Sequence, residues 1–432
     1  QQTGLAMVIF LAGLTAVPSD LIEVSDIEGA NVFQRIWHVV LPLLRPATVV
    51  VVALSVINSL KGFDILYIMT GFMVLGALDK AFLNSRLGFG EKFEEGFMAM
   101  GSLMLAMGGV ITLAPLLAAI LKPVIVPLYQ AVGADPAMFA TTLLANDMGG
   151  YPLAMQMAEN PAVGRFAGII LGAMMGPTIV FSIPVALGII EKKDHPALAK
   201  GILLGIVTIP FGCLAGGLVM LSSEFTVGMM LVNLIPVVIF SALIATGLKM
   251  IPNAMIKGFT YFGKGVVTVI TIGLAMGIIE ALSPFRFFAE GSPMALAPLS
   301  DSIATIGAIA IVLAGAFPMV MFITKVFKQP LLVFGRKLGM GDVAAAGMVA
   351  TLANNIPMFT LMKDMDERGK VINVAFAVSA AFVFGDHLGF TAGVERGLIL
   401  AMIVGKLVGG ITAVILACKV TPANAPAPAK KK

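Results

Sequence analysis

The stretch Leu143–Met155, LLANDMGGYPLAM, determines how the rest of the chain is interpreted. It is apolar at both ends, yet its centre holds an amide, a carboxylate and two adjacent glycines. A second stretch, Thr351–Met362 (TLANNIPMFTLM), repeats the Leu-Ala-Asn core 208 positions later, with Asn355 in the place of Asp147. Paired, interrupted apolar segments in two halves of a chain indicate a transporter whose binding site lies between the repeats. We therefore predict a duplicated membrane protein with its site at these two centres.

The composition favours a membrane protein. Hydrophobic residues make up 59% of the 432 residues, and charged residues make up only 12%, against about 25% in typical soluble proteins. Apolar runs recur along the chain, and many are long enough to cross a hydrocarbon layer of about 30 Å. We expect apolar segments at 4–17, 46–60, 65–83, 97–121, 137–157, 164–190, 197–221, 226–249, 260–282, 303–327, 343–362, 371–394 and 397–418.

Basic residues decide between two topologies for residues 65–432. If every segment spans, Lys and Arg divide almost evenly between the two sides, against the positive-inside rule. If the short segments 137–157 and 343–362 enter and leave on the same face, most basic residues gather on one side. We therefore predict an all-α fold with about nine spanning helices, two re-entrant elements and a cytoplasmic C-terminus. The two repeats are then inverted, and the expected divisions are repeat one at 65–225, a linking helix at 226–249, repeat two at 250–420 and a disordered tail at 421–432.

Several other functional classes are not supported by the sequence. The net charge of +4 arises from basic residues in loops and the tail, which is typical of membrane orientation and not of nucleic-acid binding. Cys213 and Cys418 lie in apolar runs without partner spacing, so we interpret them as core residues. The three histidines are scattered and no CxxC or HExxH motif indicates a metal site. We expect a transporter and not an enzyme, with no prosthetic cofactor.

The first 64 residues differ in character from the rest. Glu23-Val24-Ser25, followed by Gly29 and then by Val39–Pro42, resembles the cytoplasmic EAA loop of ABC importer permeases. Residues 59–71 resemble the end of a sugar-type permease of the same class. The resemblance implies that Glu23 and Gly29 belong to a short helix that docks on an ATPase subunit, although Val24 and Ser25 replace two alanines of the motif. Only the last third of such a subunit is covered, so we interpret residues 1–64 as a truncated segment in a fusion or chimeric sequence.

Four longer motifs mark the remainder of the chain. They are FEEGFMAMG at 93–101, GAMMGPTIVFSIP at 172–184, MVATLANNIPMF at 348–359 and FGDHLGF at 384–390. These motifs resemble the EutH-type ethanolamine utilisation transporter family, and the resemblance covers about residues 67–432. It implies a permease of the bacterial inner membrane that imports ethanolamine for ethanolamine catabolism. Its expected partners are ethanolamine or a similar small amine and membrane lipid, with a homo-oligomer left open. The alternative is a permease subunit of an ATP-driven sugar-type ABC importer, which requires an ATPase partner.

The candidate site in the first repeat follows from the chemistry of such a substrate. Ethanolamine at neutral pH is a primary ammonium with one hydroxyl, and an ionisable group inside a membrane is a functional candidate because it is costly to bury. Asp147 is the expected ammonium ligand, with capping of a half-helix as the alternative. Asn146 is the candidate partner of the hydroxyl, and Tyr151 is expected to face the cation.

The second repeat supplies amides and one further acid. Asn354 and Asn355 occupy the positions of Asn146 and Asp147, and either contact the substrate or satisfy the broken backbone. Additional candidates are Thr178, Asp386 and His387. The last two form a second cation site, a proton relay, or a buried pair that joins two helices. Thr178 is a candidate hydroxyl contact, although a threonine bonded to its own helix backbone is more common.

Overall fold

The computed structural model describes residues 18–44, 48 and 65–421. They belong to two compact units, Gln1–Tyr67 and Ile68–Lys432. Every regular element among the described residues is helical, as the sequence predicts. The apolar segment expected at 4–17 and the tail beyond residue 421 lie outside the described residues, as does nearly all of 46–60.

The described part of the N-terminal unit consists of short helices joined by a tight turn. Gly29 turns the chain with a φ of +76°, a conformation that glycine adopts without strain. Asn31 caps the next helix: its Oδ1 accepts the Gln34 N–H at 2.9 Å, and the Gln34 side chain accepts the Asn31 N–H at 2.9 Å. The elements are α2 (Ser19–Ile27), α3 (Val32–Arg35), η1 (Ile36–Val40) and α4 (Leu41–Leu43).

The larger unit contains long apolar helices, as a membrane protein requires. Six helices among the described residues are long and apolar enough to span a bilayer, and a seventh span arises if a pair bent by 42°, Pro161–Leu171 and Met175–Ile189, is counted as one. The protein is therefore a multi-pass membrane protein. The six are Phe89–Gln130, Lys192–Val219, Val227–Met250, Pro252–Leu282, Leu299–Val326 and Arg396–Val420.

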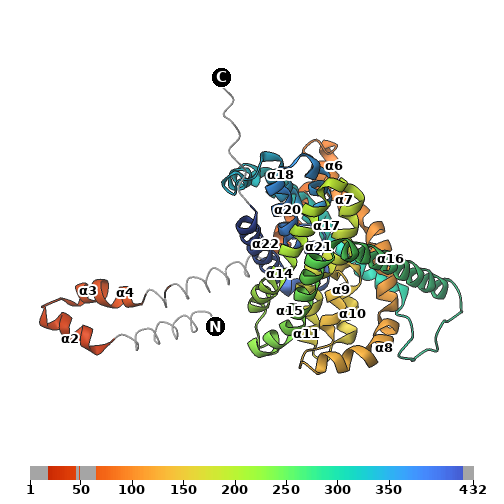
Figure 1. The fold of residues 1–432 in the computed structure, drawn as a ribbon, viewed down its shortest axis with the longest axis horizontal. Coiled ribbons are helices and arrows are strands. Elements are labelled where there is room, and N and C mark those ends of the chain that lie inside the picture. Colours follow the sequence, from red (N-terminus) through yellow and green to blue (C-terminus); the bar gives the residue numbers. More distant parts are fainter. Residues whose placement is uncertain (1–17, 45–47, 49–64, 422–432) are drawn as a thin grey trace, which may run out of the picture. The chain divides into compact units, whose positions relative to one another are not determined.

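The unit contains long helices and two groups of short ones (Figure 1). The long elements are α6 (Ile65–Leu83), α7 (Phe89–Leu103) with η2 (Met104–Gly108) and α8 (Gly109–Gln130), α14 (His195–Val219), α15 (Val227–Met250), α16 (Pro252–Leu282), α17 (Leu299–Lys337) and α22 (Ile399–Val420). The shorter ones are α9 (Ala137–Leu143), η3 (Asn146–Met148), α10 (Gly150–Met157), α11 (Pro161–Arg165), η4 (Phe166–Leu171), α12 (Met175–Pro177), η5 (Thr178–Ser182), α13 (Ile183–Ile189), η6 (Lys192–Asp194), α18 (Asp342–Thr351), α19 (Asn355–Leu361), η7 (Met362–Asp364), α20 (Glu367–Ala380), α21 (Asp386–Val394) and η8 (Arg396–Leu398).

α14, α20 and α22 form one closely packed group of helices (Figure 1). α20 is buried from Arg368 to Ala380, so it is enclosed by protein on all sides. α14 and α22 approach closely through glycines: a Cβ at Gly212 would lie 2.7 Å from the Gly405 carbonyl oxygen. Small residues at such crossings let membrane helices pack backbone to backbone.

The periphery is formed in part by α15 and α16, the least buried of the spans. Val267, Ile272 and Ile279 of α16 are exposed large hydrophobic residues. An apolar surface of this kind is stable in contact with lipid and unstable in water. The exposed face of α16 thus fits the membrane character of the unit.

Candidate functional site

The first predicted re-entrant segment is broken at its polar centre. α9 ends, and the chain passes through extended Leu144 into the 3-10 turn η3 (Asn146–Met148). Gly149 follows with a φ of +84°, and a Cβ there would lie 2.2 Å from the Val110 side chain. Both the backbone conformation and the available space therefore require glycine. The polar residues lie on a turn, where backbone groups are not all used by a regular helix.

A second broken segment crosses the first one. The sequence predicts one uninterrupted run at 164–190, but the helix is interrupted at 172–174, between η4 and α12. The Asn146 N–H donates to the Gly172 carbonyl at 2.8 Å. Gly176 lies so close to Leu144 that a Cβ would stand 2.0 Å from its carbonyl oxygen. A hydrogen bond between the two breaks thus pairs backbone groups that neither helix uses, as polar backbone at membrane depth requires.

The second half of the unit contains a crossing of the same kind. α18 and α19 are separated at 352–354, which fits the predicted interruption, and α20 and α21 are separated at 381–385. The Phe384 N–H donates to the Leu352 carbonyl at 2.9 Å. A Cβ at Gly385 would stand 2.1 Å from the Ala353 carbonyl oxygen. Again a glycine allows two broken segments to touch through their backbones.

Charged side chains from both halves meet beside the first crossing. Lys406 of α22 is 1% exposed, and its Nζ donates to the carbonyl oxygen of Ala173. The same Nζ lies 2.9 Å from His387 Nδ1. His387 Nε2 lies 3.8 Å from Asp147 Oδ1. A chain of contacts therefore runs from a backbone carbonyl through a lysine and a histidine to the candidate ammonium ligand.

The contacts relate the state of the histidine to that of the lysine. With Lys406 as an ammonium, which only donates hydrogen bonds, His387 Nδ1 is the acceptor and the neutral ring carries its hydrogen on Nε2, facing Asp147. The 3.8 Å separation from Asp147 is longer than a hydrogen bond. Among the described residues no side chain donates a hydrogen bond to the Asp147 carboxylate, and Asp147 is the N-cap of neither η3 nor α10, whose N-caps are Ala145 and Gly149. Its carboxylate oxygens thus keep acceptor capacity, and the side chain is 16% exposed.

The three candidate amides, Asn146, Asn354 and Asn355, differ in the hydrogen bonds that they make. Asn146 is fully buried, and neither atom of its side-chain amide has a partner among the described residues. Asn355 Nδ2 donates to Ser182 Oγ at 2.7 Å, which joins the two halves. Asn354 Oδ1 accepts the Ile356 N–H at 2.8 Å and caps α19. Asn354 therefore satisfies broken backbone, whereas Asn146 has both donor and acceptor available.

Thr178 bonds the backbone in the manner that is common for threonine. Its Oγ1 donates to the Met174 carbonyl of its own helix at 2.9 Å. It also lies 3.1 Å from the Val378 carbonyl oxygen of α20. The hydroxyl therefore ties the two halves together and is already engaged.

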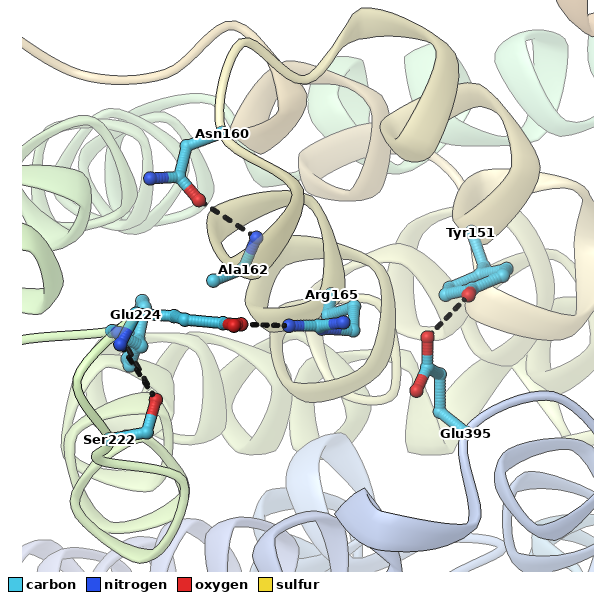
Figure 2. A network of polar contacts seen from close by, with 8 residues as sticks. Tyr151, Asn160, Ala162, Arg165, Ser222, Glu224 and Glu395 are labelled. Atoms are coloured by element: carbon cyan, nitrogen blue, oxygen red, sulfur yellow. Dashed lines mark hydrogen bonds and ion pairs between the residues drawn. The ribbon is translucent and has the colours of Figure 1, made fainter.

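Tyr151 is engaged by an acid from the other half of the chain. Its hydroxyl donates to Glu395 Oε1 at 2.9 Å, as Figure 2 shows. Its ring packs edge-on against Phe390, with centroids 5.8 Å apart. In the same view Arg165 is directed at Glu224, at 3.1 Å. These contacts hold Tyr151 through its hydroxyl and ring edge.

A cavity of about 470 Å³ ends at the second crossing. Asp386, Gly385 and Asn354 line it from the breaks in the second half, and Glu95 lines it from α7. Glu95 forms an ion pair with Lys92, which also borders the cavity. Asp386 is close enough to Asp147 for their charges to repel each other. Asp386 therefore lies both at the cavity and beside Asp147, His387 and Lys406, and these four residues are called the buried cluster below.

The candidate residues of the N-terminal unit lie on its first helix and its turn. Glu23 is exposed on α2, and Gly29 forms the left-handed turn that follows. A short exposed helix followed by a turn is compatible with the predicted docking element. The docking itself stays a prediction.

The most important residue that the sequence analysis missed is Lys406. The sequence feature that could have identified it is a single lysine inside the apolar run 397–418, because a charge buried in a membrane span is costly unless it has a partner. Glu395, Ser182 and Glu95 were also missed. Their roles depend on contacts between segments far apart in the chain, which spacing alone does not reveal.

The comparisons with known proteins agree with the resemblance in the sequence. The family of the ethanolamine utilisation protein EutH matches residues 62–420. A probable ethanolamine permease EutH of Listeria monocytogenes is 62% identical over 350 residues, which cover 81% of this chain and 91% of that protein. The protein of the same name from Escherichia coli is 52% identical and covers 83% of this chain and 95% of its own length.

A shorter likeness to ABC permeases is also present. A probable ABC transporter permease of Pyrococcus horikoshii is 49% identical over 69 residues, which are 16% of this chain and 24% of that protein. No solved structure matches. By the extent of the family match and the identity to its members, the chain belongs to the ethanolamine utilisation protein EutH family.

Proposed function

We propose that this protein is an inner-membrane permease that imports ethanolamine for catabolism. The observation that carries the proposal is the match to relatives named probable ethanolamine permease, which extends over 91% and 95% of their lengths. The long apolar helices supply the membrane barrier, and the crossed breaks supply irregular backbone inside it. Such backbone is tolerated where it is enclosed by protein or borders a wet cavity.

The charge of the buried cluster supports a monovalent cation as the substrate. With Asp147 and Asp386 ionised, His387 neutral and Lys406 protonated, the two acids exceed the bases by one charge. One ammonium group balances this excess. Asp147 is the proposed ligand, because its carboxylate is buried apart from 16% of its surface and receives no other side-chain hydrogen bond among the described residues.

The hydroxyl of the substrate is assigned to Asn146. A buried amide without partners is costly, since desolvation of its donor and acceptor is not compensated. Asn146 is next to Asp147 in the chain, and its side chain is fully buried with both polar atoms unpaired. A bound hydroxyl can donate to Oδ1 or accept from Nδ2, so one ligand removes much of this cost. Asn355 and Ser182 are proposed to support this region from the opposite half.

The cavity beside Asp386 is the proposed route on the cytoplasmic side. Lys92 and Lys325 border it, and both lie on the face that the positive-inside rule assigns to the cytoplasm. The acids Glu95 and Asp386 lie along its wall and would attract a cation. On this assignment the C-terminus is also cytoplasmic.

The two halves are proposed to be inverted repeats, with about nine spans and two re-entrant elements in residues 65–432. Support comes from the element bounds: α9 ends at Leu143 and α18 ends at Thr351, 208 positions later. η4 ends at Leu171 and α20 ends at Ala380, 209 positions later. On this reading α15 is the linking helix, and both crossings occupy the repeat interface where transporters bind their substrates.

The importer alternative rests on a much smaller part of the chain. The likeness to ABC permeases covers 16% of the residues, whereas the EutH family match runs from residue 62 to residue 420. The larger unit, Ile68–Lys432, is compact by itself. We therefore expect transport without an ATPase partner and without the N-terminal unit.

The test is uptake of labelled ethanolamine into proteoliposomes that contain the purified full chain. We expect saturable uptake without ATP, and loss of uptake in Asp147→Asn. Asp301→Asn is the matched control, because it makes the same chemical change at an exposed aspartate on α17. Uptake that requires ATP and a partner subunit would overturn the proposal.

A deletion of residues 1–64 separates the two readings of the N-terminal unit. Because the larger unit is compact by itself, we expect the shortened protein to transport ethanolamine at the rate of the full chain. Loss of transport in a shortened protein with unchanged thermal stability would show that the N-terminal unit takes part.

A further inference from the structure

Lys406 is the charged side chain whose position most requires an explanation. It lies within the apolar span Arg396–Val420 and is 1% exposed. A lysine at such depth is costly and is retained where it has a partner and a role. Its contacts are with the Ala173 carbonyl and His387 Nδ1. Neither contact carries a full negative charge, so the counter-charge comes from further along the chain of contacts.

The Ala173 carbonyl is free to bind Lys406 because of a proline. In a regular helix this carbonyl would accept the N–H of residue 177, but Pro177 has no N–H to donate. The break at 172–174 separates the same carbonyl from the preceding helix. Free carbonyls at broken helices are the groups that coordinate coupling cations in many transporters. Here the ammonium of Lys406 occupies that place.

Lys406 reaches the substrate ligand through one histidine. His387 accepts from Lys406 on Nδ1 and presents its Nε2 hydrogen to Asp147 across 3.8 Å. The other charged groups around the cluster are Asp386, which borders the cavity, and Glu95, which is paired with Lys92. Solvent in the cavity therefore compensates part of the charge of Asp386, and Lys92 compensates that of Glu95. Among the residues that the structure describes, Lys406 is the cation that reaches the deeper carboxylate, through His387.

We propose that Lys406 is a tethered cation that balances Asp147 while no substrate is bound. The inference rests on the proposed function, since it assumes that a substrate ammonium binds Asp147. A carrier that performs net uptake must return empty, and during that step the carboxylate is buried without its substrate. A buried charge without a partner is strongly unfavourable. The lysine offsets the charge of Asp147, and the remaining negative charge lies on Asp386 at the cavity, so the return step needs no inorganic cation.

The proposal separates two modes of transport. During exchange the carrier is loaded in both directions, and the substrate ammonium always accompanies Asp147. During net uptake the carrier returns without substrate and depends on Lys406. Loss of the lysine charge should therefore slow net uptake much more than it slows exchange.

The experiment compares these modes in proteoliposomes that contain the full chain. Labelled ethanolamine is added either to empty vesicles, which reports net uptake, or to vesicles preloaded with unlabelled ethanolamine, which reports exchange. For Lys406→Met we expect the ratio of net uptake to exchange to fall about tenfold or more, because the empty return step leaves a buried carboxylate unpaired. Lys419→Met is the control, since it makes the same change at an exposed position of the same helix, and its ratio should equal that of the wild type.

Two results would overturn the proposal. One is an equal loss of both modes in Lys406→Met protein with wild-type thermal stability, which would assign the lysine a structural or binding role. The other is an unchanged ratio. If Lys406→Met does not fold, net uptake by the wild type is measured in iso-osmotic sucrose without sodium or potassium, where the proposal expects the full rate. A requirement for either ion would refute it, whereas absence of wild-type exchange would instead refute the proposed function.

Discussion

The sharpest prediction concerns the affinity of ethanolamine for Asp147→Asn. The substitution keeps the shape of the side chain and removes its charge. It also replaces one acceptor oxygen with an amino group that repels an ammonium. Any loss of affinity therefore reports the carboxylate of this one side chain, through both its charge and its second acceptor oxygen.

The expected magnitude follows from the surroundings of the carboxylate. An ammonium about 4 Å from a carboxylate gains about 4 kcal/mol at an effective dielectric constant of about 20. Asp147 is 16% exposed, so some screening applies, and a hydrogen bond to a charged group contributes about 1.5–3 kcal/mol. We therefore expect a loss of about 2–4 kcal/mol, which corresponds to a dissociation constant raised about 30- to 700-fold.

Binding of labelled ethanolamine to purified protein in lipid nanodiscs measures this change directly. Asp386→Asn is the comparison, because Asp386 borders the cavity and its charge is partly served by solvent. We expect it to raise the dissociation constant about tenfold or less, as partly screened charges contribute little. A change below about threefold in folded Asp147→Asn, or a larger effect of Asp386→Asn than of Asp147→Asn, would contradict the assignment.

Two further predictions concern stability and the crossings. Lys370 Nζ lies 2.7 Å from Asp194 Oδ1, and the two side chains are 5% and 1% exposed. Lys370→Met leaves the Asp194 carboxylate buried without this partner, so we expect the free energy of unfolding to fall by about 3–5 kcal/mol. The melting temperature should fall accordingly, and Asp194→Asn should partly restore it in the double variant. Gly176→Ala places a Cβ 2.0 Å from the Leu144 carbonyl oxygen and should reduce uptake about tenfold or more, because the displaced crossing misaligns the site. Gly188→Ala is its control, since a Cβ there meets nothing within 4 Å, and equal effects of both alanines would refute the role of the crossing.

The sequence predicts the helical membrane character and two of the four breaks. Composition and segment length are sufficient for the first, because a chain with so few charges has no other stable solution. The breaks at Asn146 and Asn354 were predicted because polar residues interrupt short apolar runs. Those at 172–174 and 381–385 were not. The first lies in an apolar run where only glycine and proline mark it, and the second is followed directly by Asp386 and His387, which were interpreted as candidate site residues and not as a sign of a break.

The candidate site was only partly predictable, for a related physical reason. Asp147 and His387 stand out as ionisable groups in apolar surroundings, and their proximity within a shared cluster could be expected from the repeat. The engagement of Tyr151 by Glu395 could not, because it joins residues 244 positions apart. Sequence pattern identifies groups that need a partner, whereas packing between distant segments selects the partner.

The internal repeat explains why backbone and charge behave differently in this protein. Both halves have broken helices that cross through a glycine and a carbonyl, so the offset of 208 predicts the backbone well. It fails for the charges: the positions that match Asp147, His387 and Lys406 hold Asn355, Ile179 and Leu198. One half supplies the carboxylate, and the other supplies the histidine and the lysine. Neither half holds a complete cluster. On the proposed duplication, the repeated backbone forms the frame, and divergence of these few positions gives a single charged site at the proposed interface.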